Sequence, residues 1–551
     1  MVDICCPLTY ENAFDGDVSS NDKKIKTIID CLKKLNRDES IIKCCEINFA
    51  LFKDSDAINK RLISVYFSSQ SIKRINWFIS KQRKKNVSAD FVAFWRGQIT
   101  NMIFYILQYC PDNEGYNSID AYFNENFSKS GLLIGELLNN EDTYANTGDL
   151  FNDCIKSLSA VKCGLENSNH TPPNLLFNQI YRGYNIFVEL LSKKTVPKNN
   201  TITFDQYFLE QFKISLYDCY LYILVLITHL IYNKESPNNF IINRETFYKN
   251  ITSAEVRKDF DQLIQFLSQD TTQLNASKIK NHIDYKRSLR AKPIIQLPEN
   301  LSVVSDVTYL VDDFVSKGIL FFLSKLTKTK DVVQSIYGLC FEDYVCTLLE
   351  QRHKSGKFQS NINLSPNNQN DKLQVDAYVE LDGNIKVVYE IKASLISESK
   401  GLIDEVKEKY LNKAITQLCK RIMFFKNSDS TIYPVLITED RFISKCEFWF
   451  KSELEKQLAS NKLETKKIKV YPLIIISVET LELLPIAVDL FSILKEYHNG
   501  AFTEPNVGAN FCDYILSPQY KHGTYASDES VQLVENLLQL CKEKMFKAEP
   551  S

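Results

Sequence analysis

The sequence has few of the residues that build zinc or redox sites. The chain of 551 residues has six histidines, which lie far apart in sequence and form no HExxH-like pair. Its 15 cysteines include no CxxC pair, and the doublets Cys5-Cys6 and Cys44-Cys45 suit neither a routine disulfide nor a zinc knuckle. The odd cysteine count and the lack of a signal-peptide pattern at the N-terminus predict reduced thiols and a cytoplasmic location.

The sequence also lacks a long apolar run and a strong net charge. Its most apolar stretch, Cys219–Tyr232, covers 14 residues, which predicts a buried helix rather than a membrane span. The net charge is −2, so any surface for nucleic acid must be a local basic patch. Hydrophobic residues make up 44% of the chain, as in ordinary globular proteins, and the length predicts two or three domains.

Residues 1–275 are predicted to form a mainly α-helical domain. Lys24–Leu35 and Ala254–Leu267 show apolar residues at the three- and four-residue spacing of amphipathic helices. No repeat of fixed period is visible, so a solenoid is not predicted. We expect this domain to sense, to regulate or to bind a partner, which includes a second copy of the chain.

A basic connector is predicted to follow, over residues 276–329. It begins with a lysine- and arginine-rich stretch up to Lys292, continues with a small hairpin over Pro293–Val304, and ends with a helix over Val307–Lys325. At the other end of the chain, residues 501–551 are predicted to form a loop-rich tail with a last helix over Ser530–Phe546.

Residues 330–500 show the alternation of helices and strands that predicts an α/β domain with a mixed central sheet. The elements expected in order are a helix over Val332–Gln351, strands over Lys357–Leu364, Leu373–Leu381 and Ile385–Ser394, a helix over Asp404–Phe425, a strand over Thr431–Thr438, a helix over Phe448–Ser460 and a strand over Val470–Val478.

Charged residues lie inside the second and third of these strands. Asp382-Gly383-Asn384 joins the strands in a tight turn, so they should pair as a hairpin. Glu390 and Lys392 are two residues apart and therefore project from one face, and Asp376 joins them if the strands pair in register. Two carboxylates and an ammonium are costly to bury, and binding of a divalent metal ion would justify that cost.

This pattern resembles the PD-(D/E)xK nuclease superfamily, which has the restriction-endonuclease-like fold. The resemblance covers Lys330–His498. Glu342 stands on the first helix, Asp376 on the second strand, and Glu390-Ile391-Lys392 forms the E-x-K of the third strand.

The sequence departs from the family pattern at one position. Val375 stands where the family name has proline, at a position that varies. Gln417, on the helix after the third strand, resembles a glutamine found there in some branches of the family.

The resemblance implies a magnesium site, for which manganese can substitute. Asp376, Glu390 and the backbone carbonyl of Ile391 would bind the ion, because hard divalent ions prefer oxygen ligands. Glu342 would join through water or help to hold a second ion. Asp376, Glu390 and Lys392 would be the catalytic residues, with Lys392 beside the attacking water and the scissile phosphate.

The resemblance implies a magnesium-dependent endonuclease that hydrolyses phosphodiester bonds in DNA, and the large helical regions joined to it resemble those of prokaryotic restriction or anti-phage defence proteins. No membrane partner is expected. Three alternatives remain open at this point. One is an RNA nuclease of the same chemistry, and another is a non-catalytic scaffold with this fold that binds nucleic acid or protein. The third is a solvent-facing hairpin whose charges form surface ion pairs.

A second basic stretch lies in the helical half, over Ser71–Asn86. It contains Lys73, Arg74 and Lys81 with Trp77 and Phe78 between them. This pattern fits a patch that contacts phosphates, but a solvated helix face with two aromatic residues in the core is the favoured interpretation.

Overall fold

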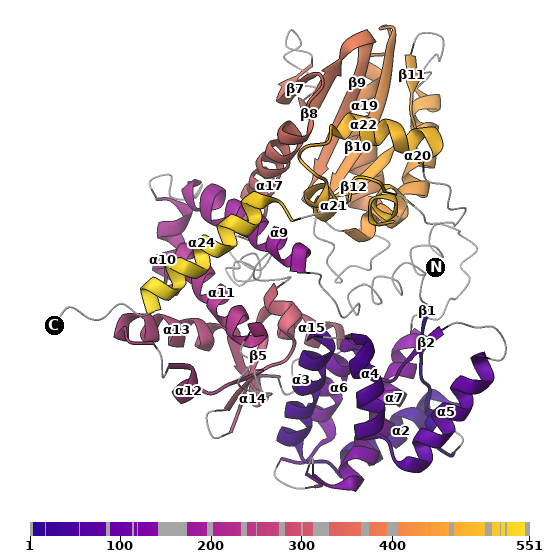
Figure 1. Cartoon of the computed structure of the whole chain (residues 1–551), viewed down its shortest axis with the longest axis vertical. Coiled ribbons are helices and arrows are strands. Elements are labelled where there is room, and N and C mark those ends of the chain that lie inside the picture. Colours follow the sequence, from indigo (N-terminus) through magenta and orange to yellow (C-terminus); the bar gives the residue numbers. More distant parts are fainter. Residues whose placement is uncertain are drawn as a thin grey trace.

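The computed structural model describes residues 4–545 except 17, 54, 84–88, 113–114, 118, 142–172, 196–201, 233–239, 249–250, 275–281, 299–300, 312–329, 365–373, 394–405, 440, 462–467, 502–509, 518–519 and 524–525. The described elements form three groups (Figure 1): an N-terminal helical region of residues 4–141, a middle region of residues 173–311 and a C-terminal α/β region of residues 330–516. The expected combination of a helical N-terminal half and a C-terminal half with a mixed sheet is confirmed at this level.

The N-terminal helical region packs its helices around a core of apolar side chains. On α2, Ser20 caps the helix by accepting a hydrogen bond from the Lys23 N–H at 3.3 Å, and Ile28 and Leu32 are buried. The helix ends three residues before the predicted end at Leu35. The region contains β1 (Ile4–Pro7), α1 (Tyr10–Ala13), α2 (Asn21–Leu32), α3 (Arg37–Lys53), α4 (Ser55–Tyr66), α5 (Ser69–Arg83), β2 (Ala89–Val92), α6 (Arg96–Tyr109) and α7 (Ala121–Glu141).

The middle region combines helices with a four-stranded sheet of order β3-β6-β5-β4. The predicted helix Ala254–Leu267 is confirmed as α13, and the predicted hairpin Pro293–Val304 is confirmed as β5 and β6. The hairpin pairs with β3 and β4, so it shares a sheet with residues assigned to the helical domain. The elements are α9 (Pro173–Gly183), the π-helix η1 (Tyr184–Leu190), the short 3-10 helix η2 (Leu191–Lys193), α10 (Phe204–Phe212), α11 (Leu216–Tyr232), β3 (Ile241–Ile242), α12 (Arg244–Tyr248), α13 (Ala254–Leu267), β4 (Ser268–Asp270), α14 (Thr271–Leu274), α15 (His282–Ala291), β5 (Ile294–Leu297) and β6 (Leu301–Val304).

Parts of the predicted connector have structure of their own. Residues 282–291 form the helix α15, whereas residues 275–281 lie outside the described residues. Most of the predicted helix Val307–Lys325 also lies outside them, and its first residues are helical from Val307.

The most apolar segment forms α11, and most of its residues are buried, as predicted. Among the described helices, none is by itself long and apolar enough to cross a membrane. Phe204–Phe212 and Leu216–Ile231 meet that test only as a pair bent by 65°.

The C-terminal α/β region is built on a six-stranded mixed sheet. Its strand order is β11-β10-β9-β8-β7, and β12 also pairs with β10. Strands β7, β8 and β9 are antiparallel neighbours, while β10 runs parallel to β9, β11 and β12. The region contains α17 (Lys330–Arg352), β7 (Lys357–Asn363), β8 (Gln374–Leu381), β9 (Ile385–Lys392), the π-helix η5 (Lys407–Ile415), α19 (Thr416–Phe424), β10 (Ser430–Thr438), η6 (Arg441–Cys446), α20 (Glu447–Ser460), β11 (Ile468–Val470), β12 (Ile474–Ser477), α21 (Val478–Leu483), α22 (Leu490–Glu496), η7 (Tyr497–Ala501) and α23 (Phe511–Leu516).

The predicted order of helices and strands is found, with one correction. The single strand expected over Val470–Val478 is divided into β11 and β12, and α21 begins at Val478. Pro472 lies in the break, where it has no N–H to donate to a neighbouring strand.

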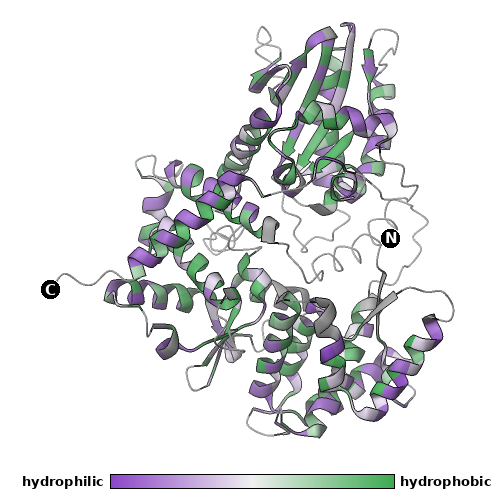
Figure 2. Ribbon diagram, viewed as in Figure 1, coloured by the Kyte–Doolittle hydropathy of each residue, from purple (hydrophilic) through white to green (hydrophobic). Residues whose placement is uncertain are grey.

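Helices cover both faces of the sheet. Helix α17 shares a core with Ala377, Val379 and Tyr389, while α19 and α20 share a second core with Tyr378 and Val388. Alternate residues of the hairpin therefore point into different cores, as the two-residue period of a strand requires. Figure 2 shows the apolar strands of this sheet between helices with hydrophilic outer faces.

The C-terminal part of the chain contacts the middle region through buried polar side chains. Arg182 on α9 is buried and donates from Nη1 to both Glu482 oxygens, at 3.2 and 3.1 Å. The last helix, α24 (Asp528–Met545), lies across the middle region (Figure 1), where the Ser530 hydroxyl donates to Asn178 Oδ1 at 3.0 Å. It corresponds to the helix predicted over Ser530–Phe546.

Candidate active site

The register of the β8–β9 hairpin decides whether its charged residues meet. The hairpin pairs Ala377 with Tyr389, and in an antiparallel ladder the next level places Asp376 beside Glu390. The Lys392 ammonium forms an ion pair with Glu390 Oε1, and Arg421 forms ion pairs with both carboxylates. These contacts bring Asp376, Glu390 and Lys392 together at one end of the hairpin.

The two strands separate at this level. The ladder ends at Ala377 and Tyr389, and the Ile391 N–H donates to Asp376 Oδ2 at 2.7 Å instead of to a backbone carbonyl of β8. Asp376 is thereby held in a fixed orientation at the open end of the hairpin.

Arg421 fills the gap between the separated strands. Its Nε donates to the Gln374 carbonyl on β8 at 2.9 Å, and its Nη1 donates to the Tyr389 carbonyl on β9 at 3.3 Å. Its Nη2 donates to Asp376 Oδ1 at 2.8 Å, and Nη1 is also paired with Glu390 Oε2. One guanidinium thus joins both strands and both carboxylates.

Glu390 is the most deeply buried charged group of the site. Its side chain is 0% exposed, and its two oxygens face the Lys392 ammonium and the Arg421 guanidinium. Each oxygen is therefore engaged by a cation. A carboxylate oxygen has more than one lone pair, so a ligand can bind Glu390 beside these cations or in place of one of them.

Sequence reasoning missed Arg421. It lies on α19, where Leu418 and Ile422 are buried against the sheet, and its own side chain is only 5% exposed. A basic residue within the apolar stripe of a covering helix is the signal that would have pointed to it. Gln417, which the family resemblance singled out, is exposed on the same helix.

Glu342 approaches the site from α17 on the other side of the sheet. It is half-buried, and burial together with the negative charges of Asp376 and Asp343 raises its pKa to about 7. The positive charges of Lys392 and Arg421 act in the opposite direction. Glu342 therefore lies within electrostatic reach of the other site residues, as the sequence predicted.

Buried polar contacts fix α17 against the strand ends. The Tyr337 hydroxyl donates to Glu439 Oε1 at 2.5 Å, and the Glu439 N–H donates to the Lys392 carbonyl at 3.2 Å. About two turns further along the helix, the Tyr344 hydroxyl donates to Glu482 Oε1 at 3.0 Å. These contacts hold the helix that carries Glu342 at a set position relative to Lys392.

Lys392 is largely withdrawn from water. Its side chain is 22% exposed, and burial lowers its pKa although Asp376 and Glu342 favour the charged form. A partly desolvated ammonium interacts more strongly with an anion and gives up a proton more easily than a solvated one. Both properties suit a group that must stand beside a phosphate and a water molecule.

A buried histidine contacts β9, the strand that carries Glu390, from the face that α17 covers. His353 Nε2 is 2.5 Å from the Tyr389 hydroxyl, and burial lowers the pKa of His353 to about 4. The ring is therefore neutral at physiological pH, and it supports β9 from the core that α17 covers.

The donor set fits a magnesium ion. Among the described residues, no three His, Cys, Asp or Glu side chains are close enough together to hold a metal ion by themselves. Magnesium, however, takes one or two carboxylates and keeps several waters. Asp376 and Glu390 supply the carboxylates, and Ile391 presents its carbonyl at the same strand edge as the N–H bound to Asp376.

The comparisons add no relative to this description. No protein-family model, no curated protein and no solved structure matches the chain. The site is therefore interpreted from its own residues and from the resemblance of its sequence pattern.

Proposed function

We propose that this protein is a metal-dependent nuclease that hydrolyses phosphodiester bonds in DNA. The observation that carries the proposal is the fully buried Glu390, which lies beside Lys392 and shares the Arg421 guanidinium with Asp376. A protein that only needed a stable hairpin would gain more from an apolar residue at this place. Two carboxylates and two cations at the open end of the hairpin are expected instead where a reaction takes place.

Asp376, Glu390 and the Ile391 carbonyl would hold a magnesium or manganese ion, and Glu342 would contact it through water. Such an ion neutralises charge on the phosphate and makes its bound water more nucleophilic. Asp376 is already oriented by the Ile391 N–H, whereas Arg421 would have to share or leave its position between the two carboxylates when the ion binds.

Lys392 would act on the phosphate and on the attacking water. Its ammonium can donate hydrogen bonds to a non-bridging phosphate oxygen and to the water, which favours the deprotonated water. The water oxygen then bonds to phosphorus while the bond to one ester oxygen breaks, which leaves a phosphate on one fragment and a hydroxyl on the other. Glu342, with its raised pKa, is placed to exchange a proton with solvent near neutral pH.

The choice of DNA as substrate rests on the resemblance to the PD-(D/E)xK superfamily, which the order α17, β7, β8, β9, α19, β10 supports. A role in prokaryotic restriction or anti-phage defence rests on the same resemblance and on the large helical regions joined to the nuclease unit. An RNA nuclease would use the same residues in the same way.

One observation favours a second candidate, a non-catalytic scaffold. Arg421 bridges Asp376 and Glu390, so a guanidinium holds the position between the carboxylates that a metal ion would approach. If Arg421 never leaves or shares this position, the site is a buried ion-pair network that only stabilises the sheet.

Cleavage assays separate these functions. The purified full-length protein is incubated with end-labelled duplex DNA, single-stranded DNA and RNA, each with Mg²⁺ and with excess EDTA. The proposal predicts cleavage of DNA that needs the metal and that Asp376→Asn abolishes. Cleavage of RNA but not of DNA would show that the protein is an RNA nuclease.

The matched control is Glu380→Gln, a carboxylate on the same strand whose side chain is 53% exposed. It should cleave like the wild type. Full loss of cleavage in this control, or full activity in Asp376→Asn, would contradict the proposed site. A wild-type protein that cleaves none of the substrates would favour the scaffold.

A further inference from the structure

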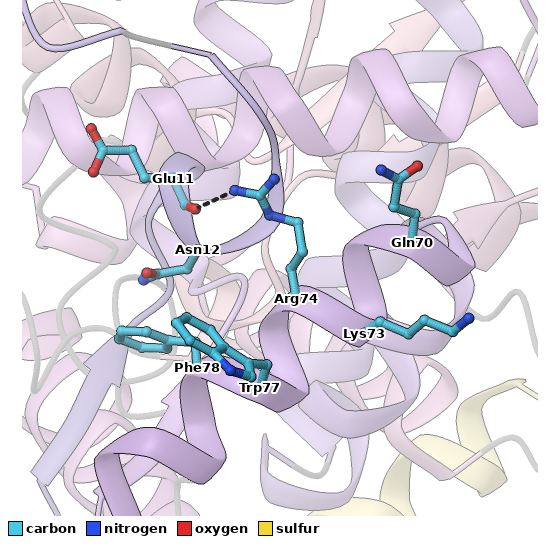
Figure 3. Close-up of a pocket in the computed structure, with 7 residues that line it drawn as sticks. All are labelled: Glu11, Asn12, Gln70, Lys73, Arg74, Trp77 and Phe78. Atoms are coloured by element: carbon cyan, nitrogen blue, oxygen red, sulfur yellow. Dashed lines mark hydrogen bonds between the residues drawn. The ribbon is translucent and has the colours of Figure 1, made fainter.

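A hollow in the N-terminal helical region has a lining that neither the fold nor the proposed hydrolysis requires. It lies between α1 and α5, has a volume of about 470 Å³ and is lined by Glu11, Asn12, Gln70, Lys73, Arg74, Trp77 and Phe78 (Figure 3). Sites for small ligands and bases typically have volumes of about 300–1,000 Å³. The hollow lies far from the β8–β9 hairpin, at the opposite end of the molecule in Figure 1.

The wall of the hollow includes an exposed tryptophan. Ile75 on α5 is fully buried, whereas Trp77 is 64% exposed. The interpretation that Trp77 packs in the core is therefore wrong. An exposed indole presents a flat apolar face that water solvates poorly and that a nucleic-acid base can cover.

Cations flank this ring at the spacing of one helical turn. Lys73 and Lys81 are four residues before and after Trp77, and both are exposed. The Lys81 ammonium lies 5.0 Å from the centre of the Trp77 ring. Neither lysine forms an ion pair with any residue that the structure describes, so both charges are available to an anion.

The remaining lining residues give the hollow a polar floor. Arg74 extends from α5 towards α1 and donates to the Glu11 carbonyl at 3.4 Å (Figure 3), and its other contact is an ion pair with the exposed Asp15. The Asn12 and Gln70 side chains carry amides that can both donate and accept at the edge of a base.

We propose that this hollow binds single-stranded DNA. One base stacks on Trp77, where it displaces the Lys81 ammonium from the face of the ring, and the phosphates on its two sides contact Lys73 and Lys81. A flat ring between two cations one turn apart matches a strand, in which planar bases alternate with negative charges. This binding surface goes beyond the proposed hydrolysis, and it would hold a strand at a distance from Asp376 and Glu390.

The test measures binding of fluorescein-labelled (dT)20 to the full-length protein by fluorescence anisotropy in EDTA, where no metal-dependent cleavage interferes. Trp77→Ala should weaken binding about 10-fold, and Trp77→Phe should recover most of the loss because stacking is retained. The double variant Lys73→Gln/Lys81→Gln should weaken binding at low salt and lower the slope of log K against log salt by about 1.4.

Two controls match these variants. Phe448 on α20 is an aromatic side chain with a similar exposure of 60%, and Lys26 is an exposed lysine on α2. Phe448→Ala and Lys26→Gln should bind (dT)20 like the wild type. Trp77 and Lys73 lie on the surface, so circular dichroism should show folded variants.

Several results would overturn the proposal. Unchanged binding by Trp77→Ala, or equal losses in Trp77→Ala and Phe448→Ala, would remove the role of the hollow. Displacement of (dT)20 by millimolar dTMP would identify a pocket for free nucleotides, and stronger competition by (rU)20 than by unlabelled (dT)20 would identify RNA as the ligand. Because the assay contains no metal, a failure of the proposed cleavage leaves its outcome unaffected.

Discussion

The β8–β9 hairpin carries an acid and a lysine at each of its two ends, and the two ends differ in burial. Near the turn, Lys386 pairs with Glu380 at 2.6 Å, and the Glu380 side chain is 53% exposed. At the open end, Glu390 is 0% exposed and shares its surroundings with Asp376 and two cations.

This difference shows why the same residue types have different consequences on one hairpin. Near the turn, water screens the charge of Glu380, and the pair contributes little to stability. At the open end, the strands separate, Arg421 enters, and desolvation makes each charge interact strongly with its neighbours. Only this end gathers two carboxylates, one of them fully buried, around a lysine and an arginine, as the proposed hydrolysis needs.

The largest expected effect is on catalysis. Lys392→Met should lower the rate of single-turnover DNA cleavage by about 10²–10³-fold, because the variant loses a positive charge aimed at the phosphate. Lys386→Met, on the same strand near the turn, should change the rate less than about threefold. Equal losses in both variants, measured on folded protein, would show that the two ends of the hairpin are not different in function.

The next effect concerns stability. Arg421→Met should lower the free energy of unfolding by about 3–5 kcal/mol, because it leaves Glu390 buried beside one cation instead of two. Addition of Ca²⁺ or Mg²⁺ should restore part of this loss, since a metal ion can replace the missing charge. Urea denaturation with and without the ion measures both quantities.

Two outcomes would contradict this explanation of Arg421. The first is an Arg421→Met protein as stable as the wild type, which would mean that the guanidinium does not compensate the buried carboxylate. The second is a destabilised variant that divalent ions do not affect, which would favour the scaffold over the nuclease.

Acid should weaken the open end of the hairpin through His353. Its pKa is about 4 in the folded protein and near 6.5 in the unfolded chain, so the unfolded chain binds a proton at intermediate pH. Stability from this group is present above pH 6.5 and is lost as the pH falls towards 4, by up to about 3 kcal/mol. His353→Gln keeps a polar partner for Tyr389. Between pH 7 and pH 4, the free energy of unfolding of this variant should fall by up to about 3 kcal/mol less than that of the wild type.

A smaller effect of opposite pH dependence is expected at Glu342. Burial and nearby acids raise its pKa from 4.5 to about 7, so ionisation destabilises the folded state as the pH rises through this range. Because the side chain is half-exposed, Glu342→Gln should stabilise the metal-free protein at pH 8 by only about 1 kcal/mol.

The same substitution should weaken magnesium-dependent cleavage, because it removes a carboxylate from the site. Glu350→Gln, which changes an exposed carboxylate further along α17, is the matched control and should alter neither property appreciably. A Glu342→Gln protein that is less stable at pH 8 than the wild type would contradict the assigned role of the carboxylate.

Much of the C-terminal region could be predicted from local patterns. Strands β8 and β9 were placed within two residues of their observed ends, because alternating side chains and the Asp-Gly-Asn turn fix both length and register. The convergence of Asp376, Glu390 and Lys392 followed from that register alone. The break at Pro472 was missed because β11 and β12 are too short to show an alternation of their own.

Other features depend on tertiary packing, which local patterns do not contain. Arg421 reaches the site only because α19 packs across the separated strands. Likewise, the sequence around Trp77 is compatible with burial and with exposure, and the packing of α5 against α1 decides between them.

The most direct test of the central claim is isothermal titration of the metal-free protein with Ca²⁺ or Mn²⁺. If Asp376 and Glu390 form a metal centre, the wild type and Glu380→Gln should bind the ion with equal affinity, and Asp376→Asn should lose this binding. Ion binding that is absent from the wild type, or that persists unchanged in Asp376→Asn, would contradict the claim and leave Arg421 as the permanent partner of both carboxylates.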